Sequence, residues 1–409
     1  RLSNAGRRAF ARGDTHAAAS LYRRSIGLMP KDDPKRLTLL PEFAEVLIDL
    51  GEFPDARAVL TEACLKSEHV ADPRVNAWSR LLELLIRLYS AEPGNWSEEI
   101  LRVAGEAIPV LERESAHYEL ANAWRIISFV HGTAGRLAQA NEAVGHSMTF
   151  ARLAGDERLA ARSAMGVSIS ALFGSMPVRQ AIVQCERVIA DGLSDRQAES
   201  VVMCTIAQLR AMNGEFEEAR SLCRQGRALL RDLGQGVNAA STALDLARIE
   251  LLAGDLAGAE QEVRADYSFL SQMGEKYFLP SMAALLSRLV RDQGRDAEAL
   301  ELSKVAEAIA AEGDIEPQAM WRLVRAPIIA RSGDLVVAEA LARDALALAR
   351  QTDMPVLQAD AWAELATVLG MAGRYDEARQ SMREAIEQYV SKGDIVSTAR
   401  SRALLDAWA

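Results

Sequence analysis

The stretch WAELATVLGMAGRYDEA, residues 362–378, decides the fold. Its apolar residues Trp362, Leu365 and Leu369 stand at i, i+3 and i+7, a spacing typical of one face of an α-helix. Gly373 interrupts this pattern, and an alanine follows five residues later. We therefore expect a helix, a tight turn closed by the glycine, and a second helix.

This glycine turn recurs from end to end of the chain, and the last five turns are 40, 40, 39 and 40 residues apart. A fixed period of this length is the signature of a solenoid, in which each repeat packs on its neighbours. A second set of glycines, halfway between the first, divides each repeat into two helices of similar length. We predict an all-α, right-handed superhelical solenoid of about ten helix-turn-helix repeats, filling residues 1–409 as one domain. The turns lie near Gly13, Gly51, Gly94, Gly135, Gly174, Gly214, Gly254, Gly294, Gly333 and Gly373, and residues 394–409 form a terminal capping helix.

Composition narrows the range of partners. The net charge is −10, which argues against nucleic acid as a main partner, because binding to its phosphates relies on clustered Lys and Arg. No stretch approaches eighteen apolar residues, so we expect no membrane span.

The four cysteines (Cys64, Cys185, Cys204 and Cys223) contain no CxxC pair. We expect them to be buried free thiols in a reducing cytoplasm, in preference to disulfides or metal ligands.

The pattern W-x2-L-A-x2-L followed by G-x-Y-x2-A, at residues 362–378, resembles the tetratricopeptide (TPR) repeat. The period near 40 differs from the usual length of about 34, which suggests longer helices and a different superhelical twist. Two repeats deviate from the pattern. At Gly94 the expected alanine is replaced by Glu99, and at Gly174 the turn is extended. Both functional bends and eroded repeats are compatible with these deviations.

Particular phrases are similar to a narrower group, the C-terminal TPR regions of bacterial adenylate/guanylate cyclase–ATPase–TPR signalling proteins and related ATPase-TPR regulators. They include residues 47–53 (LIDLGEF) and the ending at residues 392–405. In those proteins a cyclase or DNA-binding effector and a P-loop ATPase precede the repeats. The chain begins at Arg1 without a Met, and we expect it to be a piece of a longer protein. The resemblance implies regulation of such an effector.

Motifs that carry chemistry are absent from the sequence. It contains no G-x-x-x-x-G-K-[ST] phosphate loop, and its five histidines form no HExxH pair. Nothing resembles the nucleophile elbow of a hydrolase. We therefore expect no enzyme activity, no catalytic residues, and neither a cofactor nor a metal site.

The concave surface is the remaining place for a binding site. The TPR resemblance implies that the first helix of each repeat lines this surface, at the position six residues before the turn glycine. The candidate residues occupy this position or lie one helical turn away: Arg125, Gln208, Arg248, Arg288 and Arg291. Arginine suits bidentate capture of carboxylate or phosphate, so the strip is a candidate groove for an acidic peptide or an anionic effector. The alternative is that the arginines pair with nearby acids (Glu250, Asp292 or Glu298) or extend into solvent.

Two tryptophans are candidate exposed anchors for a partner. Trp96 follows an irregular turn and Trp408 lies near the end of the chain. Trp408 suits equally well a second role, that of covering the open end of the last repeat.

These observations favour a non-enzymatic scaffold for protein–protein interaction, the regulatory or sensing arm of a larger bacterial signal-transduction protein. A protein or peptide in the groove would act by its different affinity for two states of the superhelix. One alternative is a small-molecule sensor of a transcriptional regulator, with an apolar pocket near Gly94 or Gly174. A free-standing TPR adaptor and self-association through an uncapped end remain further options.

Overall fold

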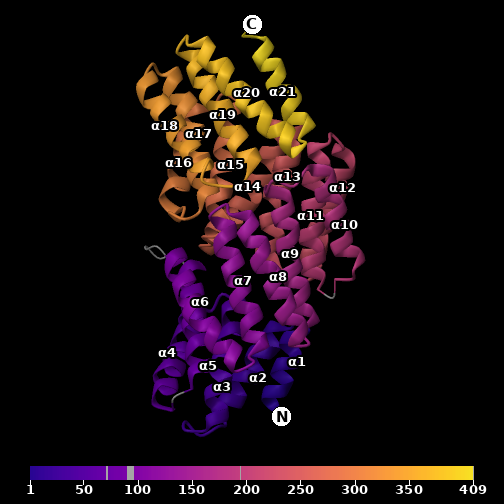
Figure 1. Ribbon diagram of the computed structural model, residues 1–409, viewed down its shortest axis with the longest axis vertical. Coiled ribbons are helices and arrows are strands. Elements are labelled where there is room, and N and C mark those ends of the chain that lie inside the picture. The colour runs from indigo at the N-terminus through magenta and orange to yellow at the C-terminus, as the bar shows by residue number, and fades with distance from the viewer. Residues whose placement is uncertain (71, 90–95, 194, 409) are drawn as a thin grey trace. The chain divides into compact units, whose positions relative to one another are not determined.

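The computed structural model describes residues 1–409 except 71, 90–95, 194 and 409. The described residues form 21 helices and no strand, which confirms the all-α prediction (Figure 1). The predicted turn at Gly94 lies outside the described residues. The helices are α1 (Leu2–Ala11), α2 (Thr15–Gly27), α3 (Pro34–Asp49), α4 (Phe53–Val70), α5 (Pro73–Tyr89), α6 (Trp96–Arg113), α7 (His117–Thr133), α8 (Leu137–Leu153), α9 (Glu157–Phe173), α10 (Val178–Ala190), α11 (Arg196–Met212), α12 (Phe216–Asp232), α13 (Gly236–Ala253), α14 (Leu256–Met273), α15 (Leu279–Asp292), α16 (Asp296–Ile309), α17 (Ile315–Arg331), α18 (Leu335–Ala349), α19 (Pro355–Met371), α20 (Tyr375–Lys392) and α21 (Ile395–Asp406).

The hairpin formed by α19 and α20 shows how the repeat motif works. Gly373 has a φ of 73°, a left-handed conformation that costs glycine little, and it reverses the chain between the two helices. Ala366 and Ala378 are both fully buried. Small side chains at these positions let paired helices approach closely, as the sequence predicts.

The turn between α20 and α21 uses a Gly-Asp pair. Gly393 ends α20 with a φ of 80°, and the carboxylate of Asp394 accepts a hydrogen bond from the Ser397 backbone N–H at 2.9 Å. The glycine thus closes one helix and the aspartate caps the next.

The turn between α6 and α7 lacks a glycine. Ser115 takes its place with a φ of 51°, and it is the one non-glycine residue with positive φ in the described parts of the chain. A side chain in this conformation costs about 1 kcal/mol. We expect Ser115→Gly to raise the free energy of unfolding by about 0.5–1 kcal/mol, measured by urea denaturation. The matched change Ser128→Gly, inside α7, should lower it by a similar amount, and equal effects of the two changes would contradict this explanation.

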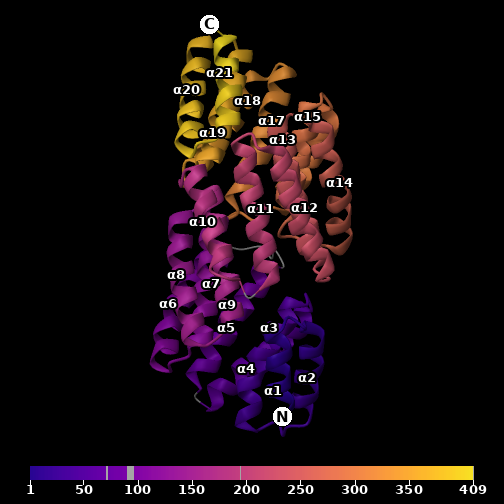
Figure 2. The same ribbon diagram turned by 90° about the vertical axis from the view of Figure 1, so that its right-hand side faces the viewer.

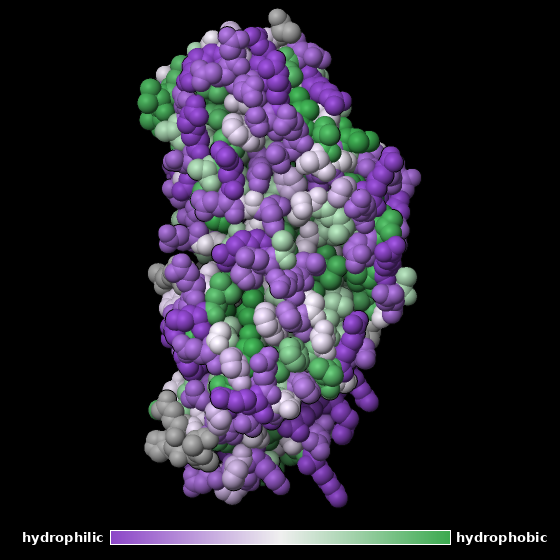
Figure 3. Space-filling model, viewed as in Figure 1, coloured by the Kyte–Doolittle hydropathy of each residue, from purple (hydrophilic) through white to green (hydrophobic). Residues whose placement is uncertain are grey.

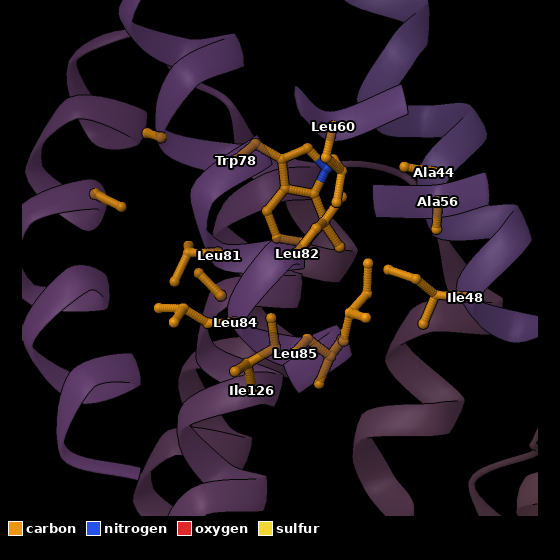
Figure 4. Packing of buried hydrophobic residues seen from close by; sticks show 14 of the residues in the cluster. Ala44, Ile48, Ala56, Leu60, Trp78, Leu81, Leu82, Leu84, Leu85 and Ile126 are labelled. Atoms are coloured by element: carbon orange, nitrogen blue, oxygen red, sulfur yellow. The ribbon is translucent and has the colours of Figure 1, made fainter. Parts of the chain in front are cut away.

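The chain separates into two compact units. Unit 1 comprises residues 1–130 and 143–160, and unit 2 comprises residues 131–142 and 161–409. The single continuous solenoid over residues 1–409 stays a prediction. In unit 1, Trp78 and Leu82 of α5 pack with Ile48 of α3 and Leu60 of α4 in the main hydrophobic core (Figure 4).

Unit 2 is held together by contacts between segments far apart in the sequence as well as between successive helices. The Asp353 carboxylate accepts hydrogen bonds from the backbone N–H groups of Leu137 and Ala138 at 2.7 and 2.8 Å, and so caps the start of α8. Arg400 of α21 donates to the carbonyl oxygens of Leu251 and Leu252 at the end of α13. In both views α21 meets the end of α11 (Figures 1 and 2).

The strongest of these contacts is made by Lys392, the last residue of α20. Its side chain is fully buried, and Nζ donates to the carbonyl oxygens of Ala171, Gly174 and Met176 at 2.8, 2.7 and 2.9 Å. These carbonyls lie at the end of α9 and in the extended turn at Gly174. We call this contact the Lys392 clasp. The irregular turn therefore presents carbonyl groups to a lysine more than two hundred residues away.

Candidate functional site

Unit 2 encloses a chamber of about 490 Å³. It is lined mainly by the first helix of each successive hairpin, as the TPR resemblance implies. The contributing helices are α9, α11, α13, α15, α17 and α19, completed by α20 and α21. A volume of this size is within the range of ordinary ligand pockets.

The lining of the chamber is largely apolar and contains four methionines. These are Met212, Met320, Met354 and Met382, together with leucines and Phe173. Methionine is unbranched and polarizable, so such a lining adapts to apolar groups of different shapes.

The polar part of the chamber consists of ion pairs between first helices two hairpins apart. Arg248 Nη2 lies 2.5 Å from Glu316 Oε1, joining α13 to α17. Two pairs join α15 to α19: Arg288 Nη1–Asp360 Oδ2 and Arg291 Nη2–Glu364 Oε1, each at 2.6 Å. Four arginines and five carboxylates line the chamber, so it is not a basic groove.

Arg288 lies at the centre of the polar network. The charge of Asp360 is the main cause that raises the pKa of Arg288 above its usual value. Asp360 also accepts a hydrogen bond from the Tyr389 hydroxyl, whose pKa is raised by burial and then by this carboxylate. Arg288 Nε is buried and has no acceptor among the described residues.

Arg248 and Gln208 occupy the side of the chamber near α9. The Arg248 guanidinium lies over the Phe173 ring, 5.3 Å from its centroid, in a cation–π contact. Gln208 Nε2 donates to Asp245 Oδ1 at 2.7 Å. Burial raises the pKa of the Asp245 carboxyl to about 6.

The structure thus brings four of the five predicted groove residues to one chamber: Gln208, Arg248, Arg288 and Arg291. Arg125 lies in unit 1, where it donates to Asn122 Oδ1 at 3.2 Å. Arg291 pairs with Asp292, one of the acids foreseen for such pairing. Glu250 pairs instead with Arg220. Glu298 pairs with Arg264 and Arg295.

Both predicted tryptophan anchors are half-buried. Trp96 packs against the core of unit 1, and the Arg87 guanidinium lies 4.9 Å from its ring centroid. Trp408 packs near Gly370 of α19, and Arg379 donates to its backbone oxygen at 2.8 Å. The anchor and end-covering roles both stay predictions.

Several chamber residues had no signal in the sequence that singled them out. Glu316, Asp360 and Glu364 are acids on first helices, and such residues usually form a solvated helix face. The spacing of Asp360 and Glu364, i and i+4, matches one helical turn and faces Arg288 and Arg291. The sequence suggested an apolar pocket near Gly94 or Gly174 as one alternative. Phe173, the residue next to Gly174, lines the chamber.

Within the described residues, no helix is both long and apolar enough to cross a membrane. The face seen in Figure 3 is mostly hydrophilic, with smaller hydrophobic patches between the polar residues.

Comparisons with known proteins identify the fold. No protein-family model matches the chain, and no curated protein matches its sequence. A solved Rap protein complexed with competence and sporulation factor superimposes with a TM-score of 0.59 at 13% identity, covering 93% of this chain and 100% of that chain. Yeast Tom70 gives 0.45 at 13% identity, covering 100% and 88%. The APC/C hetero-tetramer Cut9–Hcn1 gives 0.41 at 10% identity, covering 100% and 89%.

Similarity at these identities concerns the fold, and the Rap structure superimposes closely enough to support it. The Rap protein is a TPR-repeat protein. The chain therefore has the all-α, superhelical repeat fold of tetratricopeptide-repeat proteins.

Proposed function

We propose that unit 2 is a non-catalytic scaffold that holds a segment of a partner protein in its chamber. The observation that carries this proposal is the chamber itself, about 490 Å³, with a lining that combines adaptable apolar side chains and an arginine–carboxylate network. Small-molecule and peptide sites share this composition, a mainly apolar surface with a few polar groups that fix orientation.

The polar network indicates the chemistry of the segment. An acidic ligand would have to displace Glu316, Asp360 or Glu364 from their arginines, which costs the energy of existing ion pairs. A segment with apolar side chains has no such cost. We therefore favour an apolar, extended peptide segment over a strongly acidic one.

The Rap structure supports a binding role by analogy of fold, because that protein is complexed with competence and sporulation factor. We further propose that occupancy of the chamber regulates an effector of a bacterial signalling protein, as the resemblance to cyclase–ATPase–TPR proteins implies. A segment that binds a closed form of unit 2 more tightly than an open form would shift the population of molecules toward the closed form.

A second candidate function is small-molecule sensing. It is favoured by one observation, that Leu172 and Phe173 bring the chamber to the irregular turn at Gly174. A metabolite of suitable size would then occupy the same apolar lining.

The test fills the chamber without removing any contact. Ala363 lines it, so Ala363→Phe should weaken binding of chamber ligands by at least about 10-fold, or 1.4 kcal/mol. The probes are peptides selected on the full chain from a displayed random library and measured by calorimetry. The matched control is Ala347→Phe, at an exposed position of α18, which should bind as the unchanged chain does.

Different outcomes separate the proposals. Selected peptides that bind Ala363→Phe as tightly as the unchanged chain would exclude the chamber as their site. If no peptide binds but a metabolite raises the melting temperature of the unchanged chain and not of Ala363→Phe, small-molecule sensing is the correct function. Regulation is tested on a longer chain carrying its upstream domains, where ATP hydrolysis unaffected by a bound peptide would contradict it.

A further inference from the structure

Three potential metal ligands meet inside unit 2, on three successive helices. Cys204 lies on α11, Cys223 on α12 and Asp245 on α13, and their ligand atoms are all within 4.8 Å of one another. The two sulfur atoms are 3.6 Å apart. Both cysteines are free, and they are 2% and 0% exposed.

The backbone is shaped to bring these sulfur atoms together. Gly226 lies one turn after Cys223, and a Cβ there would be only 3.0 Å from the Cys204 sulfur. The absent side chain therefore provides the room for Cys204 between α11 and α12. The Cys223 thiol donates to the Cys204 sulfur, a weak contact for two buried polar groups.

No positive side chain completes this cluster. Asp245 accepts one hydrogen bond, from Gln208, and forms no ion pair within the described residues. The nearby guanidinium groups are engaged elsewhere: Arg248 pairs with Glu316, and Arg227 pairs with Glu262 and Asp266. A half-buried carboxylate beside two buried thiols thus has a place for a cation that the chain itself does not supply.

The distances match a bound ion better than a disulfide. A tetrahedral zinc ion with Zn–S bonds of about 2.3 Å holds two thiolates about 3.8 Å apart, close to the observed separation. A disulfide requires about 2.05 Å, so the sulfurs would have to approach by a further ~1.5 Å. Two sulfurs and a carboxylate oxygen also form a donor set that zinc accepts.

We propose that Cys204, Cys223 and Asp245 form a site for a thiophilic divalent cation, with Zn²⁺ as the natural occupant. The ion replaces the two thiol protons, which leave to solvent, and the product is one Zn²⁺ bound by two thiolates and one carboxylate. A fourth position remains for water. Gln208 joins the site to the chamber, because it lines the chamber and contacts Asp245. This site is independent of the proposed peptide-binding function.

The test uses the full chain, reduced and stripped of metal by a chelator, with ZnCl₂ as the only added ligand. We expect one zinc per chain to remain after gel filtration, measured by mass spectrometry of the element. The variant Cys204→Ser/Cys223→Ser should bind zinc at least about 100-fold more weakly. The matched control, Cys64→Ser/Cys185→Ser, removes the same number of thiols elsewhere and should bind as the unchanged chain does.

A second measurement needs no substitution at the thiols. Cobalt added to the unchanged chain should produce sulfur-to-cobalt charge-transfer absorption in the near ultraviolet. Asp245→Asn should keep this band and weaken zinc binding, because both thiolates remain. The proposal is overturned if the reduced, unchanged chain retains no zinc and shows no such band. It is equally overturned if Cys204→Ser/Cys223→Ser retains zinc with unchanged affinity, which would place the ion at another site.

Discussion

Lys392→Met is expected to open unit 2, with a loss of about 3–5 kcal/mol in its free energy of unfolding. The substitution removes the Lys392 donor from the buried carbonyl groups of Ala171 and Gly174 and from the half-buried carbonyl group of Met176. Each unsatisfied group costs about 1–3 kcal/mol, and the loss is partly offset because a buried ammonium no longer has to be desolvated. Burial lowers the pKa of Lys392 to about 8, so the ammonium is still mostly protonated at neutral pH.

Denaturant unfolding gives the energy, and hydrogen exchange gives the location. We expect the backbone amides around the turn at Gly174 and the start of α21 to exchange faster in Lys392→Met. Lys304→Met is the matched control, because Lys304 is exposed on α16 and pairs only with Glu301, a contact worth less than about 1 kcal/mol. Equal stability and equal exchange in the two variants would show that the Lys392 clasp does not hold unit 2 closed.

The Lys392 clasp anchors a helix that lines the chamber. Met382 and Tyr389 of α20 line the chamber, and Lys392 anchors the end of the same helix to the region after α9. We therefore expect Lys392→Met to weaken binding of chamber peptides even though Lys392 does not touch the chamber. The closure of unit 2 and the shape of the chamber would then depend on the same contact.

Arg288→Met is the second large effect, with an expected loss of about 3 kcal/mol. The substitution keeps the length and apolar stem of the side chain but leaves the Asp360 carboxylate, whose side chain is 16% exposed, without its cation. Removing one member of a buried ion pair is strongly destabilising for this reason. Unfolding by urea at pH 7 measures the loss.

A double-mutant cycle separates the pair from its surroundings. Arg288→Met/Asp360→Asn should recover most of the lost stability, because no charge remains unpaired and Asn can still accept from Tyr389. Arg331→Met, which breaks an exposed pair with Asp296, should cost less than about 1 kcal/mol. A double variant as unstable as Arg288→Met would mean that the arginine acts through packing and not through its charge.

Local features of the fold followed from the sequence. The turn glycine at position 373, the Gly-Asp pair at 393 and 394, and the buried alanines 366 and 378 were all predictable, and the structure confirms their roles. Their signals are local, because helix caps and close-packing positions depend on residues within a few positions along the chain. The turn at Ser115 carried no glycine, so its left-handed conformation was not foreseen.

The candidate site was predictable in part. Gln208, Arg248 and Arg288 share one position of the repeat, and the TPR resemblance implied that this position lines the inner surface. The acidic partners of the arginines could not be predicted, because no pattern in the sequence pairs Arg288 with an acid two hairpins away. For the same reason the sequence left open both a basic strip and arginines paired with acids, and the structure has a paired, neutralised network.

The sequence by itself determined that this protein is a series of helical hairpins and where most of the glycine turns between its helices lie. The tertiary structure alone decided that unit 2 closes on itself, that its arginines are paired, and that Cys204 meets Cys223. The pairing of Arg248 with Glu316 joins residues 68 positions apart, and the clasp of Lys392 on Ala171 joins residues 221 positions apart. Such contacts depend on how small rotations between hairpins add up, and side-chain packing along the whole of unit 2 sets those rotations.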